Sequence, residues 1–171
     1  DLIKTTTALH YDSSCYLCPG NKRVSGSINP PYTDVFIFEN DHPVVGYDAP
    51  EVNSGIFYKK GRAAGIAKVV CYDARHNITL SQMKLEKVIG VFESFQVEMK
   101  AFEQDPTIKS VLIFENKGEA VGVSNPHPHC QIYAVDFSLK LVEQQIRVGR
   151  EYYDRIGKNI FEDIIQSELL D

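Results

Sequence analysis

A single long amphipathic helix, set among short apolar runs, constrains the fold of this chain more than any other feature. Over residues 80–104 apolar side chains recur at intervals of three and four, the period of one helical face. These side chains are Leu85, Val88, Ile89, Phe92, Phe95, Met99 and Phe102. Thr79 and Gln82 have the spacing of a capping box, and Asp105-Pro106 ends the helix. One helix among strands favours an α+β fold over a parallel βαβ array.

Short runs of β-branched and aromatic residues predict strands before and after this helix. They cover residues 35–39, 55–58, 65–72, 110–115 and 131–135. The first run is continuously apolar, which predicts burial on both of its faces. Towards the end of the chain, residues 139–156 and 161–170 have helical periodicity, with a break at Gly157.

Size and charge exclude several classes of protein. The 171 residues suffice for one domain, and a net charge of −5 gives no overall attraction for nucleic acid. The apolar runs are all shorter than a membrane span, and the first residues lack the pattern of a signal peptide. Four unevenly spaced cysteines do not make a disulfide framework, which favours a reducing, cytoplasmic setting.

The pair Cys15 and Cys18 lies in a loop of about thirty residues that is rich in turn formers. Two thiolates at this spacing can hold one tetrahedral zinc ion, which would order such a loop. The alternative is a redox-active dithiol, whose usual setting is a helix N-terminus after a strand. Zinc would need two more ligands, and the candidates are His10, His42, His76, His127 and His129.

The segment around His127-Pro128-His129 is the richest in chemically competent side chains. In an extended chain the two histidines share a face, and Cys130 alternates away from it into the packing. Pro128 restricts the backbone between them. A neutral imidazole is a nucleophile near pH 7, and a phosphorus centre would suit it. The alternative for such a pair is a structural metal site or a hydrogen-bonded turn.

Residues that suit anionic oxygens flank the two histidines. Gly118 and Gly122 allow the backbone to approach a phosphate closely, while Asn116, Ser124 and Gln131 can donate hydrogen bonds to it. Together with an imidazole nucleophile these are the components of a nucleotidyl-transfer site.

These motifs resemble the galactose-1-phosphate uridylyltransferases of the histidine-triad (HIT) superfamily, over about residues 13–137. The matching segments are residues 15–23, Asn29-Pro30, Tyr32, 38–41, 114–118 and 124–132. The resemblance implies a HIT-like, mainly antiparallel sheet with packed helices, one of the two homologous halves of the family's chain. Residues 1–171 would be the N-terminal catalytic domain, with a metal-binding loop region at 1–31 and C-terminal helices at 139–171.

The resemblance also implies a reaction and a set of roles. His129 would attack UDP-glucose, release glucose 1-phosphate, and pass the uridylyl group to galactose 1-phosphate in a ping-pong mechanism. The implied substrate-binding residues are Gln131, Ser124, Asn116, Asn40, Asp41, Tyr16 and Leu17. The implied zinc ligands are Cys15, Cys18, His76 and His127.

The second metal site of the family is altered in this chain, and the sequence leaves alternative functions open. Many members bind a second metal, iron or zinc, through a glutamate whose position holds Gln145 in this chain, with Glu143 nearby. The family also implies a homodimer. The alternatives are a HIT-superfamily nucleotide phosphorylase or hydrolase, of the ADP-glucose or diadenosine-tetraphosphate type, or an inactive zinc-stabilised half-domain.

Overall fold

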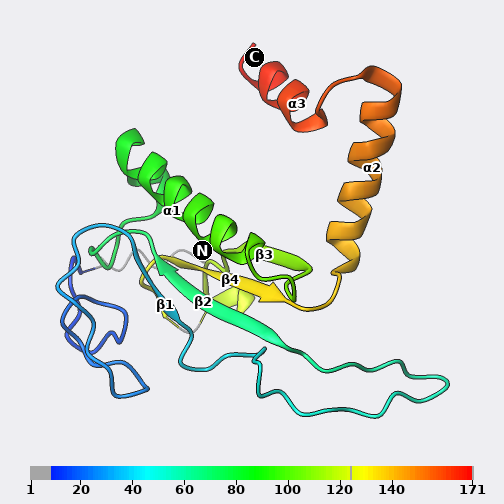
Figure 1. The fold of residues 1–171 in the computed structure, drawn as a ribbon. Helices are drawn as coiled ribbons and strands as arrows, with labels where there is room; N and C mark the ends of the chain where they lie inside the picture. Colours follow the sequence, from blue (N-terminus) through cyan, green and yellow to red (C-terminus); the bar gives the residue numbers. More distant parts are fainter. Residues whose placement is uncertain (1–8, 124, 171) are drawn as a thin grey trace. The chain divides into compact units, whose positions relative to one another are not determined.

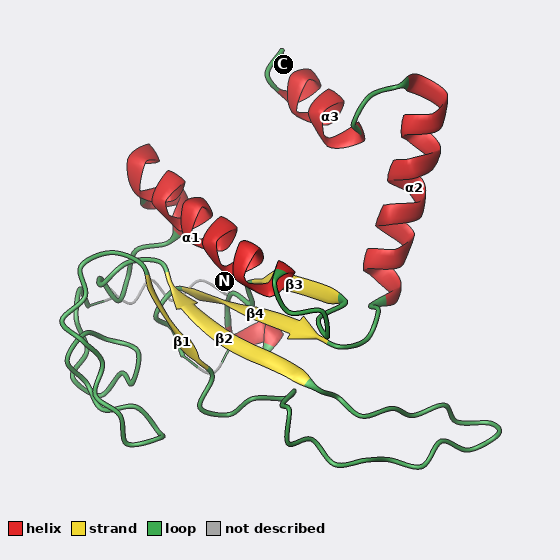
Figure 2. Ribbon diagram, in the orientation of Figure 1, coloured by secondary structure: helices red, strands yellow, loops and turns green. Residues whose placement is uncertain are grey.

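A computed structural model describes residues 9–123 and 125–170 (Figure 1). The chain divides into two compact units, Asp1–Asp136 and Phe137–Asp171. The first unit contains the strands and the long helix α1, and the second contains α2 and α3 (Figure 2). The candidate site lies in the first unit.

The described residues of the first unit form a four-stranded sheet in the order β1-β2-β4-β3. Its strands are β1 (Phe36–Glu39), β2 (Gly65–Cys71), β3 (Ser110–Phe114) and β4 (His129–Val135). All three pairings are antiparallel, and the central register sets Cys71 opposite His129 and Val69 opposite Gln131. The predicted α+β class with a mainly antiparallel sheet is therefore confirmed.

Different segments of the chain pack on the two faces of the sheet. The helix α1 (Leu85–Glu103) packs on one face, where Val91 and Phe102 join Val70, Ile132 and Ala134 in a buried cluster. The turn-rich N-terminal loop covers the other face, where Cys15, Leu17 and Cys18 pack against Val69 and Cys71. Alternation along β2 and β4 thus separates a packing face from the face that carries the candidate chemistry.

The predicted start of the long helix is wrong by five residues. Leu80–Gln82 form a separate 3₁₀ turn (η1), and Met83 is extended with ψ 152°, so α1 begins only at Leu85. The capping box is present, but it closes η1: the Thr79 N–H donates to Gln82 Oε1 at 3.1 Å. The helix ends before Asp105-Pro106, as predicted.

Two strand predictions also need correction. Residues 55–58 form no strand but part of a loop between β1 and β2 that extends away from the sheet (Figure 1). Ile56, Phe57 and Tyr58 are exposed there, because strand propensity without a partner strand does not make a strand. β1 is half-buried rather than buried on both faces, since it lies at the edge of the described sheet.

The second unit contains two helices, α2 (Lys140–Ile156) and α3 (Ile160–Glu168), which lie where the sequence predicted helices at 139–156 and 161–170. Gly157 ends α2 with φ 75°, a left-handed conformation that favours glycine. Asn159 caps α3 by accepting the Phe161 N–H at 2.9 Å. A short 3₁₀ turn, η2 (Glu119–Val121), precedes the segment that leads into β4. None of the helices in residues 9–123 and 125–170 is long and apolar enough to cross a membrane.

Candidate active site and metal centre

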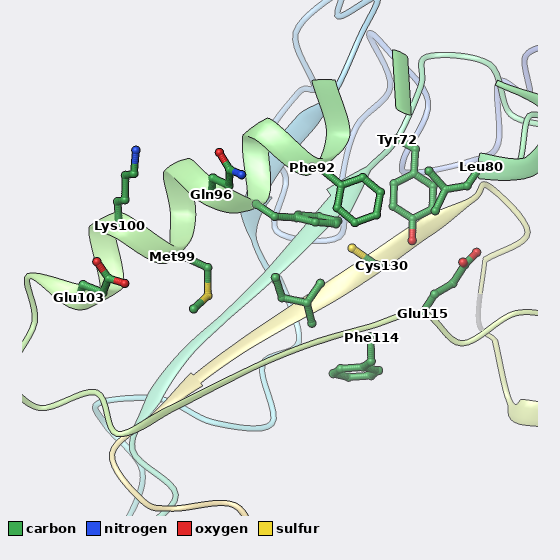
Figure 3. Close-up of a pocket in the computed structure, with 12 residues that line it drawn as sticks. Tyr72, Leu80, Phe92, Gln96, Met99, Lys100, Glu103, Phe114, Glu115 and Cys130 are labelled. Atoms are coloured by element: carbon green, nitrogen blue, oxygen red, sulfur yellow. The ribbon is translucent and has the colours of Figure 1, made fainter. Parts of the chain in front are cut away.

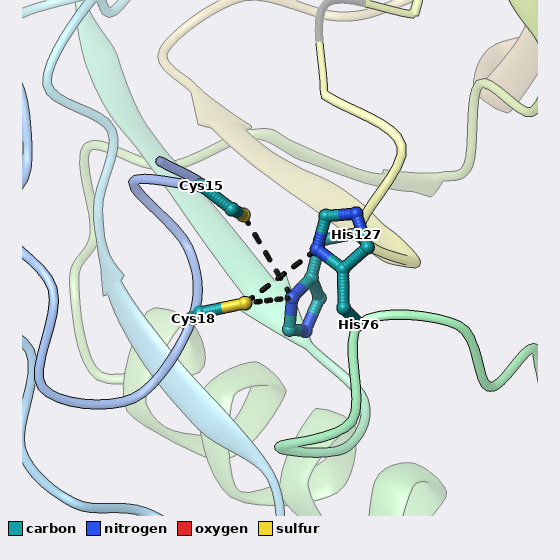
Figure 4. A group of neighbouring side chains, drawn as sticks. All are labelled: Cys15, Cys18, His76 and His127. Carbon is teal, nitrogen blue, oxygen red and sulfur yellow. Dashed lines mark hydrogen bonds between the residues drawn. The ribbon is translucent and has the colours of Figure 1, made fainter. Parts of the chain in front are cut away.

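Four buried side chains from three separate segments converge on one point: Cys15, Cys18, His76 and His127 (Figure 4). Their ligand atoms all lie within 4.8 Å of one another. Cys18 Sγ is 3.5 Å from Nδ1 of both histidines, and Cys15 Sγ is 4.0 Å from Nδ1 of His127. A tetrahedral zinc ion with ordinary bond lengths needs sulfur–nitrogen separations of about 3.6 Å. The cluster therefore has the size and donor set of a metal site.

Further contacts orient these side chains. His127 Nε2 lies 2.9 Å from the carbonyl oxygen of Asp73, which can only accept, so Nε2 carries the proton and Nδ1 presents a lone pair to the cysteines. The Leu17 N–H donates to Cys15 Sγ at 3.3 Å, and the Asn125 side chain lies 3.4 Å from the same sulfur. These two contacts hold the Cys15 side chain in place.

Electrostatics in this cluster favour a bound cation. Burial raises the pKa of the Cys18 thiol to about 11 and lowers the pKa of His127 to about 4. Without a cation the thiol stays protonated and the imidazole neutral, whereas a metal would favour the thiolate. The cysteines are free thiols in the described chain, and Cys15 and Cys18 face two imidazoles. This arrangement favours the metal interpretation over a redox dithiol.

Spacing alone left the histidine ligands open, and the structure selects two of the five. The side chains of His10 and His42 lie outside the cluster, at exposed loop positions. His127 and His129 also differ in surroundings, because β4 begins at His129 and the residues before it form a loop. The rule of alternating faces thus applies from His129 onward, while His127 lies completely buried beside the cysteines.

His129 is held so that one ring nitrogen is left for chemistry. Its Nδ1 lies 2.7 Å from the carbonyl oxygen of His127. Because a carbonyl only accepts, Nδ1 must carry a proton, and in the neutral ring Nε2 bears the lone pair. The ring is half-buried and lines two cavities.

The first cavity, ≈ 280 Å³, brings together most of the residues that the resemblance assigned to the nucleotide. Those that line it beside His129 are Tyr16, Leu17, Asn40, Asp41 and Gln131. Val24, Phe38, Val44 and Val69 add apolar walls. His42 and Tyr133 line it as well, and the sequence reasoning missed both in this role. Tyr133 could have been found by alternation from His129 and Gln131.

The second cavity, ≈ 190 Å³, also borders His129 and is lined by Asn116, Lys117 and Gly118. Gly118 has φ 91°, a left-handed backbone conformation that glycine adopts readily. Asn116 and Gln131, both predicted phosphate contacts, therefore lie in different cavities that share His129. Ser124, the remaining predicted contact, lies outside the described residues.

Arg23 supports the wall of the first cavity and was also missed. Its guanidinium lies 4.2 Å from the centroid of the Phe38 ring and forms an ion pair with Asp41 at 3.3 Å. The Ser25 N–H donates to the other oxygen of Asp41 at 3.3 Å. Arg23 thereby connects the metal-binding loop to the end of β1.

A larger cavity, ≈ 630 Å³, lies between α1 and the packing face of the sheet (Figure 3). Phe92 and Met99 of α1 line it together with Tyr72 and Cys130. None of the predicted catalytic, substrate-binding or metal-binding residues lines it. Cys130 and Cys71 are both buried, Cys130 among the residues of this face, as predicted from their strand positions.

Comparison with known proteins identifies the family. The family model described as "Galactose-1-phosphate uridyl transferase, N-terminal domain" matches residues 1–138. The chain belongs to the galactose-1-phosphate uridyl transferase family. Galactose-1-phosphate uridylyltransferase of Haemophilus influenzae is 38% identical over 164 residues, which cover 93% of this chain and 46% of that protein.

Solved structures confirm the HIT-like α+β fold. One described as "Structure of uridylyltransferase" superposes with a TM-score of 0.76 at 26% identity, covering 96% of this chain and 52% of that chain. An ADP-glucose phosphorylase from Arabidopsis thaliana shares the fold, with a TM-score of 0.65 at 20% identity, covering 86% of this chain and 48% of that chain. The chain spans about half the length of the relatives that it matches.

Proposed function

We propose that this chain carries the nucleotidyl-transfer centre of a UDP-glucose–hexose-1-phosphate uridylyltransferase. Nε2 of His129 would attack the α-phosphorus of UDP-glucose, forming a P–N bond as the P–O bond to glucose 1-phosphate breaks. The phosphate oxygen of galactose 1-phosphate would then take the uridylyl group, giving UDP-galactose and regenerating the imidazole. The observation that carries this proposal is the 2.7 Å contact from His129 Nδ1 to the His127 carbonyl, which leaves Nε2 as the lone-pair nitrogen.

The surroundings of His129 support transfer at phosphorus. Charge moves among the nonbridging oxygens during such a transfer, so fixed donors close to the nucleophile lower the barrier. Gln131 lies two residues along β4 from His129 and lines the same cavity. Asn116 and the backbone at Gly118 border His129 from the second cavity. Ser124 remains a proposed donor from the sequence.

The first cavity suits the nucleoside. Tyr16, Phe38 and Val44 provide apolar surface for a base, while Asn40 and Asp41 are polar groups beside it. Tyr16 and Leu17 belong to the same loop as Cys15 and Cys18, so a metal-ordered loop would also form a wall of the nucleotide site.

We propose zinc as the resident metal, held by Cys15, Cys18, His76 and His127. When bound, zinc would supply an orienting charge and no redox chemistry. The chain's own contribution is the carbonyl of His127: the residue whose imidazole would be a ligand also accepts the hydrogen bond from His129 Nδ1. Order in the metal site and alignment of the nucleophile are thereby connected through one residue.

Several wider features are proposals from the family alone. Residues 1–171 would act as the N-terminal catalytic domain of a cytoplasmic homodimer, with the hexose phosphate held largely by the second half of the family's chain. A second metal, iron or zinc, would have to be bound with Gln145 where the family has glutamate.

The proposal is tested by intact-protein mass spectrometry of the zinc-loaded chain after incubation with UDP-glucose, quenched in alkali to preserve phosphoramidates. A mass gain of one uridylyl group is expected for the unaltered chain and for a His10→Ala control, whose histidine is exposed. No gain is expected for His129→Ala. Absence of the adduct from the unaltered chain, and from a chain extended to the length of its relatives, contradicts the proposal. An adduct with ADP-glucose instead supports a phosphorylase of the ADP-glucose type.

A further inference from the structure

The side-chain amide of Gln131 is held at its oxygen end by two donors. The Tyr133 hydroxyl donates to Gln131 Oε1 at 3.1 Å, and Asn40 Nδ2 donates to the same oxygen at 3.3 Å. Gln131 and Tyr133 are two residues apart on β4 and face the same cavity as His129. The orientation of this amide decides whether the cavity meets a donor or an acceptor beside the nucleophile.

The two donors are themselves fixed. Asn40 Oδ1 accepts the His42 N–H at 3.0 Å, so the amino group of Asn40 must face Gln131. The Tyr133 ring packs edge to face on Phe114, with centroids 4.9 Å apart and an interplanar angle of 84°. Burial raises the pKa of Tyr133, so its hydroxyl keeps its proton at neutral pH and can donate to Gln131 Oε1.

These contacts give Gln131 one preferred orientation. With Oε1 turned to Tyr133 and Asn40, the amino group is the end of the amide left for the cavity. The flipped amide would set its amino group against the amino group of Asn40, which can only donate, and would present its oxygen to a phosphate, which is repulsive.

We infer that Tyr133 is a positioning residue for the proposed transfer: its hydroxyl holds the Gln131 amide so that the amide N–H groups face the phosphate oxygens beside His129. The inference rests on the proposed function and adds to it a residue that acts through Gln131 without touching the reacting atoms. A phenylalanine at this position would keep the packing on Phe114 and remove one of the two donors that hold Gln131 Oε1.

The test is a double-mutant cycle on the first-order rate of uridylyl-adduct formation at saturating UDP-glucose. Tyr133→Phe is expected to slow the reaction about fivefold, the effect of one neutral hydrogen bond, while zinc content and the half-saturating UDP-glucose concentration stay unchanged. In a Gln131→Ala background the same change is expected to have no effect, because the amide is gone. The matched control Tyr153→Phe, at an exposed position in α2, should react like the unaltered chain.

An equal slowing in both backgrounds, or none in either, overturns the inference. A second measurement separates it from the proposed function: the side-chain amide resonances of Gln131 in the ¹⁵N-labelled, nucleotide-free chain. Tyr133→Phe should shift these resonances and Tyr153→Phe should not. If neither the unaltered chain nor a chain extended to the length of its relatives forms an adduct, the proposed function fails. The resonances then decide alone whether Tyr133 holds the amide, and unchanged resonances overturn the inference.

Discussion

The proposed metal centre predicts a defined dependence of stability on free zinc. A ligand that binds only the folded chain at one site stabilises it by RT ln(1 + [L]/Kd), or about 1.4 kcal/mol for each tenfold rise above Kd. The cluster has one set of four converging donors, which gives a one-site slope. For a chain of 171 residues this corresponds to a rise in the midpoint of thermal unfolding of about 3–6 °C per tenfold.

The perturbation that tests this slope is His76→Ala. His76 follows β2, far along the chain from the other histidine ligand, and its Nδ1 lies 3.5 Å from Cys18 Sγ. Its loss leaves three donors, so the midpoint should become nearly independent of zinc over the range in which the unaltered chain responds. His10→Ala removes a histidine outside the cluster and should leave the slope intact.

The assay is thermal unfolding of both variants across buffered free-zinc concentrations, with bound metal measured by elemental analysis. Adduct formation by His129 should decline together with bound zinc, because the carbonyl that orients His129 belongs to the ligand His127. The assignment of these four residues would be refuted if the unfolding midpoint of the unaltered chain did not change with free zinc. It would also be refuted if the midpoint of the His76→Ala variant rose with free zinc as steeply as that of the unaltered chain.

Three further substitutions test other parts of the structure. Arg23→Ala should weaken UMP binding about fivefold by calorimetry, since Asp41 loses a charged partner; unchanged affinity would exclude this role. Gly65→Ala should lower the free energy of unfolding, measured by urea denaturation, by about 2–4 kcal/mol, whereas Gly149→Ala should not lower it. At Gly65, with φ +155°, an added Cβ would lie 2.2 Å from the Ala134 oxygen, whereas Gly149 has open space. Thr79→Ala should cost less than about 1 kcal/mol and leave helical circular dichroism unchanged; a loss of helicity would place the capping box on α1.

The pattern of apolar, β-branched and aromatic residues predicted the helices and the central strands, although the buried residues of α1 are Val91 and Phe102 and most of its predicted apolar face is exposed. It found α1 and both central strands, but it extended α1 through Leu80, an apolar residue that belongs to η1. It also predicted a strand at residues 55–58, which is wrong because these residues have strand propensity but no neighbouring strand to pair with. Whether a strand is central or at an edge depends on sheet order, which no local pattern contains.

The candidate metal ligands also depend on tertiary contacts that a local sequence pattern does not contain. Spacing identified Cys15 and Cys18 as a pair, but it could not choose among five histidines. The choice depends on the register of β2 and β4, which sets Cys71 opposite His129. That pairing brings the segment after β2, with Asp73 and His76, against the segment before β4, with His127. The resemblance indicated His76 and His127 because the motifs of a family include residues that are far apart in sequence and close together in the fold.

The strand β4 explains why the candidate metal site, His129 and the Gln131 amide lie close together. The candidate ligand His127 lies two residues before His129, the first residue of the strand, and Gln131 and Tyr133 follow on the same face as His129. The alternate residues Cys130, Ile132 and Ala134 are buried against the side of the sheet that α1 covers. The hydrophobic packing that fixes this strand therefore also fixes the spacing of the reactive face. A shift of β4 by one residue would turn His129 towards the side that α1 covers and would turn Ile132 and Ala134 towards the side that the N-terminal loop covers. The register that packs the core therefore also places His129.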